Sequence, residues 1–422
     1  MFNSVALILF ISIIVTALFN VKCGLTLFLG YKILMPINGV MIAGHYLYGN
    51  YLALYLFIIF ALRYGAKIRE WNYTMVIPYA LYFGWYMFAA WLGWSPLESL
   101  AYIRSDILAI TLVPLMVVNF AKFNFNDFTE LRKALTLFVA IAVIYGVILI
   151  PFKGFNPYTV LMYQVSGREV PVDWLMDSER LFGRITSTFM HAMYYAAFLT
   201  FATIYVMFRF KCTGRSGYKI LLFFAVVSIV TCGVRSAIMA FMAVMLYYYF
   251  KRGAARMFKF ISLAMLLVIA IGIIVPQLYE YLLSPFSAGD DALVRGSSID
   301  MRVAQWSAAF EVIRGSMLFG NGYGWSTDYI VNFGNHPTLL AFESQVVKQL
   351  CEGGIFGTLL FAFVYYMFFS MKLHDALLKL FIPMMVIAYL VYTILTGDYL
   401  YSAYFMIFLS FIYAEKYSHE KY

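Results

Sequence analysis

The chain has 422 residues, of which 64% are hydrophobic and only 12% are charged, and its mean hydropathy is +0.82. Soluble domains carry about 25% charged residues, so this composition excludes a soluble enzyme or a soluble binding module. It predicts an integral membrane protein, and the length suits a single transmembrane domain over residues 1–422.

The charged and metal-ligating residues exclude two further classes. The net charge is +9, but the basic residues lie in short loops, as positive-inside topology requires, so we expect membrane lipids and no nucleic acid as partners. The four cysteines lack CxxC spacing, and no two of the five histidines lie three or four residues apart. The spacing therefore indicates neither a metal site nor a disulfide framework. We also expect no cofactor.

Apolar segments long enough to cross a bilayer, about 17–25 residues, recur along the whole chain. They predict an all-α polytopic fold with 11 to 13 transmembrane helices. The predicted spans lie near residues 4–20, 24–41, 50–64, 74–93, 104–121, 134–151, 188–208, 218–233, 235–250, 260–277, 344–371, 377–396 and 399–414.

Four basic clusters fall on one side of the membrane if these spans are correct, and positive-inside topology makes that side cytoplasmic. The clusters are Arg63–Arg69, Lys122–Lys133, Arg209–Lys219 and Lys251–Lys259. Two longer connections, 152–187 and 278–343, then lie on the opposite, extracytoplasmic face.

The second long connection begins with a turn-rich segment and then becomes helical in pattern. Val303, Trp306, Phe310 and Ile313 recur at near-helical spacing, which predicts an amphipathic helix at the outer interface. The glycines of Gly320–Gly324 follow it without the GxxxxGK[ST] pattern of a phosphate loop. We therefore expect a tight turn where the backbone approaches another helix.

Three arginines lie at the outer boundaries of apolar segments: Arg184, Arg235 and Arg302. A planar guanidinium binds phosphate through bidentate, charge-assisted hydrogen bonds without a metal, and charges at membrane depth are costly enough to suggest function. Arg235 is the strongest case, because apolar residues flank it on both sides. The alternative is that each side chain reaches lipid headgroups or a loop carboxylate, which is the favoured interpretation for Arg184 or Arg302 alone.

Two carboxylates and a histidine are candidates for acid–base chemistry. Glu343 stands at the entrance to an apolar helix, where partial burial would raise its pKa toward that of a general base; a helix dipole explains an acid there equally well. Glu352, nine residues further, is expected to join helices or to pair with Lys348. His336 is a second candidate base, although a loop histidine is more often only a surface residue.

Four segments, in this order, resemble the O-antigen polymerase and ligase superfamily, which are bacterial inner-membrane glycosyltransferases of the class C type. Gly183–His191 resembles the arginine-containing entry to the helix after the first periplasmic loop, and Val234–Ser236 resembles the arginine step inside the helical core. Arg302–Gly324 resembles the family's segment of arginine, tryptophan and spaced glycines, and Glu343–Gly357 resembles the start of its next helix. The resemblance covers residues 180–370.

This resemblance implies a class C-like fold in the bacterial inner membrane, with both long loops and the active site facing the periplasm. It implies a glycan donor and a glycan acceptor linked to undecaprenyl diphosphate, with the diphosphate held by Arg184, Arg235 and Arg302. Neither a nucleotide sugar nor a metal is then needed. A chain-length regulator protein stays open as a further partner.

The residue at the base position separates the two activities of the family. The ligase pattern places a histidine nine residues before Glu352, where this chain has Glu343; His336 lies seven residues earlier. The carboxylate favours a polymerase, in which Glu343, or His336 as second choice, deprotonates the acceptor hydroxyl that attacks the anomeric carbon with inversion. Tyr323 and Trp325 are expected to stack on sugars, unless they belong only to an interfacial aromatic belt.

Two alternatives stay open beside this preferred function. An O-antigen ligase shares the arginines but transfers the glycan to lipid A core. A lipid-linked oligosaccharide flippase or other transporter would carry ionisable residues near the middle of several spans, and the predicted spans contain few. The gathering of candidate residues at the outer face favours an interfacial enzyme.

Overall fold

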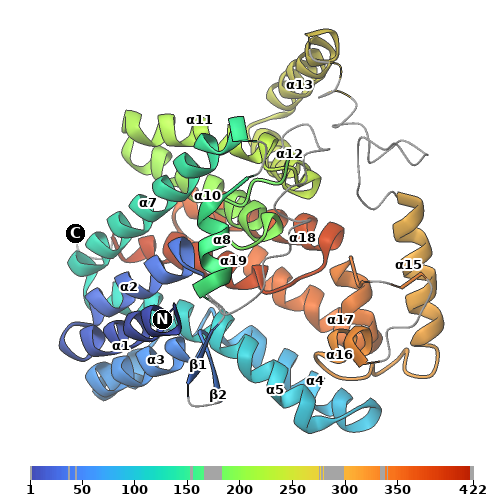
Figure 1. The fold of residues 1–422 in the computed structure, drawn as a ribbon. Coiled ribbons are helices and arrows are strands. Elements are labelled where there is room, and N and C mark those ends of the chain that lie inside the picture. The colour runs from blue at the N-terminus through green and yellow to red at the C-terminus, as the bar shows by residue number, and fades with distance from the viewer. Residues whose placement is uncertain are drawn as a thin grey trace.

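The computed structural model describes residues 2–36, 39–42, 45–152, 155–165, 183–274, 276, 279, 299–332, 338–339 and 341–418. Almost all regular structure in these ranges is helical, as predicted (Figure 1). The helices are α1 Phe2–Phe19, α2 Val21–Leu34, α3 Tyr51–Tyr64, α4 Ile77–Gly93, α5 Pro96–Ile107, α6 Val113–Phe123, α7 Phe125–Ile148, α8 Pro157–Val165, α10 Ala192–Thr213, α11 Ser216–Thr231, α12 Arg235–Phe250, α13 Ala254–Ile274, α15 Ile299–Val312, α16 Trp325–Asn332, α17 Gln345–Phe369, α18 Ala376–Thr396 and α19 Tyr401–Ala414.

Among the described residues, seven helical segments are long and apolar enough to cross a membrane. They are Tyr51–Glu70, Pro96–Phe123, Phe125–Ile148, Ala192–Thr213, Ala254–Ile274, Gln345–Phe369 and Ala376–Thr396. The prediction of an all-α polytopic membrane protein is confirmed. The expected 11 to 13 spans also included shorter segments, such as those that form α2 and α19. Each of these helices has 14 residues and is about 21 Å long, which is shorter than the roughly 30 Å hydrocarbon core.

One predicted helix ends early and is followed by the only strands in the described part of the chain. The segment 24–41 was expected to be a single helix, but α2 ends at Leu34. Pro36 disfavours a helical backbone in the residue before it and cannot donate a backbone hydrogen bond. Beyond it, β1 (Gly39–Ile42) and β2 (His45–Tyr48) pair antiparallel.

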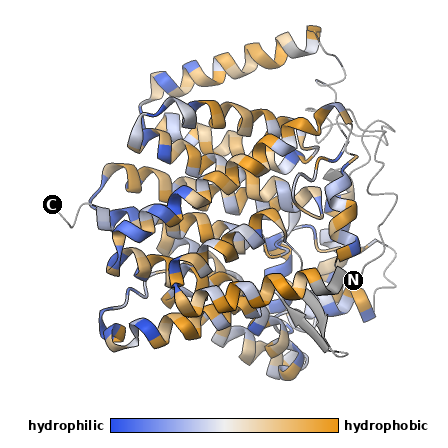
Figure 2. Cartoon of the chain, turned by 60° about the vertical axis from the view of Figure 1, so that its left-hand side comes forward, coloured by the Kyte–Doolittle hydropathy of each residue, from blue (hydrophilic) through white to orange (hydrophobic). Residues whose placement is uncertain are grey.

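The centre of the bundle is formed by α10 and α19, which pack against each other and against α18. Every residue of Tyr195–Arg209 in α10 is buried, and α19 is buried except at Ala403. The outer helix α13 shows the opposite pattern, with Leu263 65% and Ile273 78% exposed. Figure 2 shows apolar residues along nearly every helix. Apolar side chains that face outward as well as inward are what a lipid environment permits.

The second long connection contains the predicted interfacial helix, α15, but its buried face differs in part from the prediction. Trp306 and Ile313 do pack inward, whereas Val303 is 54% and Phe310 is 45% exposed. Helical periodicity identifies an apolar stripe, but it does not say whether lipid or protein covers that stripe. In the first long connection the described residues include α8, and residues 166–182 lie outside the described ranges.

Three of the predicted basic clusters meet at one end of the bundle. The Glu415 carboxylate accepts hydrogen bonds from Arg132 and, at 2.9 Å, from Arg209. Lys122 donates to the backbone carbonyl of Glu70. These contacts support the prediction that the clusters share one side of the membrane.

Helix α2 connects this basic end to the opposite end. At its start, Lys22 pairs with Asp127 at 3.0 Å. Near its end, the backbone carbonyl of Ile33 accepts a 2.7 Å hydrogen bond from the Thr188 hydroxyl. The segment that carries Arg184 therefore lies at the end of the bundle away from the basic clusters.

The Glu415 network makes a stability prediction. Glu415→Ala leaves the guanidinium groups of Arg132 and Arg209 without their shared carboxylate, in positions where both side chains are less than 15% exposed. Removing one partner of a buried ion pair costs about 3–5 kcal/mol, so thermal unfolding in detergent should occur at a clearly lower temperature. The matched control is Glu130→Ala, which breaks an exposed pair with Lys133 and should cost about 1 kcal/mol or less. Equal effects of the two substitutions would contradict the structural role of Glu415.

Candidate functional site

The glycine-rich loop after α15 is joined to a break in α17. Helix α17 has a non-helical residue at Gly354, with φ +64° and ψ −165°. Beside this break, Asn321 donates its backbone N–H to Cys351 O at 3.1 Å, and Gly322 donates to Glu352 O at 2.7 Å. The loop therefore occupies backbone acceptors that a continuous helix would use itself.

The glycines at this junction allow the close approach of the two backbones. A Cβ atom at Gly320 would collide with the Glu352 carbonyl, and one at Gly354 would collide with the Leu318 carbonyl. Both glycines also have positive φ, +78° and +64°, which other residues adopt only at a cost. The predicted tight turn against another helix is confirmed.

The buried side chain of Glu352, in α17, connects α16 to the same junction. Its Oε1 accepts from the Ser326 hydroxyl and, at 3.3 Å, from the Ser326 backbone N–H. Lys348 does not form an ion pair with it within 4 Å; its ammonium group donates to Asp398 O at 3.2 Å. Of the two predicted roles for Glu352, the structure therefore supports joining helices.

Arg302 and Glu343, 41 residues apart in the sequence, lie side by side. Arg302 Nε is 3.9 Å from Glu343 Oε2, and the two side chains are 23% and 32% exposed. Burial lowers the pKa of Arg302, and the Glu343 carboxylate opposes that shift. Arg302 comes from α15 and Glu343 precedes Ser344, the N-cap of α17. The structure thus brings together the candidate base and one of the three candidate diphosphate-binding arginines.

The other two arginines, Arg184 and Arg235, are brought together by a contact between two turns. A Cβ at Gly233 would lie 2.5 Å from Gly183 O and 3.6 Å from the Cα atom of Arg184. Gly183 and Gly233 both have positive φ, +65° and +76°. The turn that begins α12 therefore packs directly on the backbone next to Arg184.

The start of α12 has the features of an anion site. Arg235 is its first residue, and the N-cap residue, Val234, makes no side-chain capping hydrogen bond. The Ser236 side chain is buried beside the Tyr392 hydroxyl. Unsatisfied backbone N–H groups at a helix N-terminus favour negative charge. An arginine as the first residue of the helix strengthens that preference.

His191 lies close to Arg184 in the structure. Burial, together with the nearby Arg184 guanidinium, lowers the pKa of His191 to about 4, so its imidazole is neutral at pH 7. Its Nδ1 atom accepts the backbone N–H of Met193 at 3.2 Å and caps α10. The ring lies edge-on to Tyr194, with centroids 6.5 Å apart.

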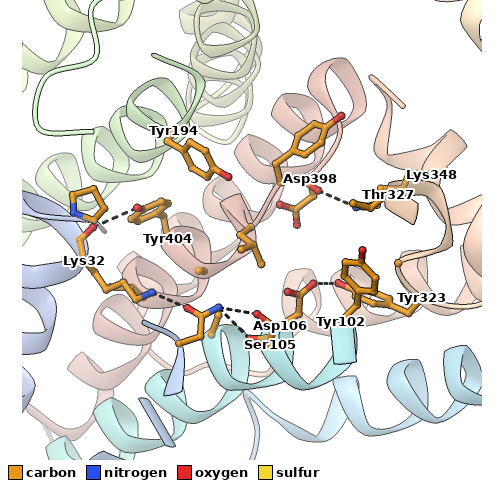
Figure 3. A pocket seen from close by; sticks show the side chains of 18 of the residues that line it. Lys32, Tyr102, Ser105, Asp106, Tyr194, Tyr323, Thr327, Lys348, Asp398 and Tyr404 are labelled. Atoms are coloured by element: carbon orange, nitrogen blue, oxygen red, sulfur yellow. Dashed lines mark hydrogen bonds between the residues drawn. The ribbon is translucent and has the colours of Figure 1, made fainter. Parts of the chain in front are cut away.

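A cavity of about 360 Å³ with four charged side chains in its wall lies among α2, α5, α17 and α19, and Figure 3 shows its lining. Lys32, Asp106, Lys348 and Asp398 supply its charged groups, and a set of tyrosines supplies much of its wall. The tyrosines are Tyr31, Tyr102, Tyr194, Tyr323, Tyr399 and Tyr404. Among the described residues, no three His, Cys, Asp or Glu side chains gather in a way that could hold a metal ion.

Two tyrosines of the cavity wall connect it to the segments that carry candidate residues. Tyr194, on one wall, contacts His191, which lies near Arg184. On another wall, the Lys348 ammonium group lies 5.7 Å from the centroid of the Tyr399 ring. Lys348 is the fourth residue of α17, and Glu343 comes directly before the N-cap residue of that helix. The cavity therefore adjoins His191 on one side and, on another, the start of α17, which follows Glu343.

The remaining predicted site residues differ in their relation to this cavity. Tyr323 lines it and donates to the Asp106 carboxylate; burial and that carboxylate raise the pKa of Tyr323 well above its usual range, so the phenol stays a donor. Trp325 does not line the cavity and packs on Tyr329, with ring centroids 5.0 Å apart. His336 lies outside the described residues.

Sequence reasoning missed the charged groups of the cavity. From the sequence, Lys348 is considered only as a partner of Glu352. Lys32 and Asp106, which lie within the predicted apolar spans 24–41 and 104–121, are not singled out there. Ionisable residues within apolar spans are themselves an indication of a functional site. Side chains from α2, α5 and α17 meet here, and no local pattern in the sequence links these helices.

The comparison with protein families gives a match to part of the chain. Residues 220–362 match the family Wzy_C, described as O-antigen ligase. The chain thus carries a domain of this ligase and polymerase family, whose members transfer lipid-linked glycans, and the resemblance inferred from sequence is confirmed over these residues. The comparison with curated proteins gave no match.

The matched segment contains part of the candidate site. Arg235, Arg302 and Glu343 lie within residues 220–362, whereas Arg184 lies before them. Lys32 and Asp106 of the cavity also lie outside the match, and Lys348 lies inside it. The cavity is therefore built jointly by the family domain and by helices outside it.

The contact between the Gly233 turn and the backbone of Arg184 can be tested by adding a single methyl group. Gly233→Ala adds a Cβ next to Gly183 O at a residue with φ +76°, which should lower the free energy of unfolding by about 1–3 kcal/mol. Thermal unfolding in detergent measures this. Gly217→Ala is the control, because nothing lies within 4 Å of its added Cβ and Gly217 is helical; it should be neutral or slightly stabilising. Unchanged stability of Gly233→Ala would contradict the contact.

Proposed function

We propose that this protein is an O-antigen or related surface polysaccharide polymerase. It joins oligosaccharide repeat units linked to undecaprenyl diphosphate at the periplasmic face of the inner membrane. The observation that carries the proposal is the start of α12: Arg235 is the first residue of the helix, its N-cap residue makes no side-chain capping hydrogen bond, and the turn before it packs on the backbone of Arg184. This arrangement suits a diphosphate, and the family match supports a lipid-linked glycan as its carrier.

In the proposed reaction, Glu343 accepts the proton of a hydroxyl on the terminal sugar of the acceptor. The hydroxyl oxygen forms a bond to the anomeric carbon of the growing glycan, and the bond from that carbon to the diphosphate oxygen breaks. The electron pair leaves with undecaprenyl diphosphate, and a single displacement inverts the anomeric carbon. The product is a longer glycan on the lipid of the acceptor.

The arginines act on the charge that develops at the leaving group. Fixed donors aimed at such charge are effective because they need no rearrangement during the reaction. Arg184 and Arg235 would bind the diphosphate from the α12 side. The guanidinium of Arg302 has donors on several nitrogen atoms, so it can contact Glu343 through one edge and a diphosphate oxygen through another.

The choice of polymerase over ligase rests on Glu343. Its carboxylate lies within 3.9 Å of Arg302 Nε, so a residue able to accept a proton stands next to a group able to hold the leaving diphosphate. A carboxylate at the position where ligases have a histidine favours the polymerase.

Arg235→Ala should abolish long glycan chains while single repeat units still reach the cell surface, because transport does not need stabilisation of the leaving group. Loss of one such donor lowers the rate by about 100-fold or more. Surface polysaccharide from a deletion strain that expresses the variant, separated by gel electrophoresis, measures this. Arg256→Ala, an exposed arginine of the predicted cytoplasmic cluster, is the control and should retain long chains.

Two outcomes of that experiment would overturn the proposal. Long chains made by the Arg235→Ala protein would show that this arginine does not bind the diphosphate. In the deletion strain itself, accumulation of long polymer on undecaprenyl diphosphate, without transfer to lipid A, would identify a ligase.

Glu343→Gln should reduce the rate of polymerisation by about 100- to 10,000-fold, the usual contribution of a general base. Glu343→Asp, which keeps the carboxylate, should recover part of it. The rate is measured with the purified protein and lipid-linked repeat units. If Glu343→Gln retains full activity and His336→Ala loses it, the base is His336.

A further inference from the structure

The volume of the cavity limits what it can hold. At about 360 Å³, it lies at the small end of the range for small-molecule sites, roughly 300–1,000 Å³. It therefore suits the terminal sugar of a glycan and excludes a lipid tail or an entire repeat unit.

The charges of the cavity balance one another. Lys32 and Lys348 oppose Asp106 and Asp398, so the formal charge of the lining is zero. The Asp398 carboxylate is already hydrogen-bonded within the protein. It accepts 2.7 Å hydrogen bonds from the Tyr389 hydroxyl and from the Tyr401 backbone N–H at the start of α19. A lining of this kind favours an uncharged, hydroxyl-rich ligand over an ion.

Three side chains keep hydrogen-bonding capacity for a ligand. Asp106 uses Oδ2 for Tyr323, and no described residue donates to its Oδ1. The Lys348 ammonium group has three donors and gives one hydrogen bond, to the Asp398 carbonyl. The hydroxyl of Thr327, an exposed residue of the wall, donates to no described residue. An acceptor and two donors suit sugar hydroxyls, which both donate and accept.

The remaining wall combines aromatic rings with unusual backbone. Tyr102, Tyr194 and Tyr404 offer ring surfaces that suit the apolar face of a sugar. Leu400, also in the wall, has φ +69°, and a π-helical turn, Leu108–Leu112, begins two residues after Asp106. Strained non-glycine residues and π-turns concentrate at functional sites.

We propose that this cavity binds the terminal sugar of the acceptor glycan, with Asp106, Lys348 and Thr327 as its hydrogen-bonding residues. The assignment rests on the proposed function, since it names the substrate part that this side of the site receives. Lys348 of the cavity wall is the fourth residue of α17, and Glu343 comes directly before the N-cap residue of that helix, so a sugar seated here lies next to the segment that carries the candidate base. The arginines then need to bind only the donor.

The probe is the free oligosaccharide repeat unit, released from its lipid diphosphate by mild acid, which cannot use the arginine sites for diphosphate. Its binding to the purified full-length protein in nanodiscs is measured by calorimetry. Asp106→Asn removes the carboxylate and should weaken binding about tenfold or more. Thr327→Trp fills the cavity from an exposed position and should weaken binding equally. Because Thr327 is exposed, this variant tests the cavity even if Asp106→Asn does not fold.

Arg302→Gln is the matched comparison. It should leave the affinity for the free repeat unit unchanged and weaken binding of the lipid-linked form. Unchanged binding of the free repeat unit by Asp106→Asn and Thr327→Trp would overturn the proposal, as would an equal loss in Arg302→Gln. Absence of binding to the wild-type protein that still makes polymer would also overturn it, while leaving the proposed function intact.

Discussion

The site depends on an exchange of backbone hydrogen bonds between the glycine-rich loop and α17. In an unbroken helix, the carbonyl groups of Cys351 and Glu352 would accept from Ile355 and Phe356. Here they accept from Asn321 and Gly322, and the N–H group of Ile355 donates to Met317 O. The break at Gly354 is therefore compensated by the loop, which satisfies the buried backbone groups that the break releases.

This exchange sets the positions of residues on two sides of the cavity. It fixes the loop, so that Tyr323 reaches Asp106 of α5. It also fixes the first part of α17, which carries Lys348 and begins just after Glu343. The buried contact of Glu352 with Ser326 adds α16 to the same unit. Tyr323, Lys348 and the segment that follows Glu343 are thus held by one junction rather than by separate loops.

Two sets of arginines lie at opposite ends of the bundle. At one end, Arg132 and Arg209 share Glu415, and their charges are compensated within the protein. At the other end, Arg235 is the first residue of α12, and the N-cap residue of this helix makes no side-chain capping hydrogen bond. The N-terminus of a helix favours negative charge, so this end of the bundle is the one suited to an anion.

The sequence by itself determined that the chain is a helical membrane protein and where most of its helices lie, because composition and apolar segments are local properties. It also identified the glycine turn and the candidates Arg235, Arg302 and Glu343. Only the tertiary structure decided that Arg302 lies next to Glu343, that the Gly233 turn packs on Arg184, and that Lys32, Asp106 and Lys348 share a cavity. Those residues come from separate helices, and their meeting depends on how the helices pack and where α17 breaks, which no local pattern specifies.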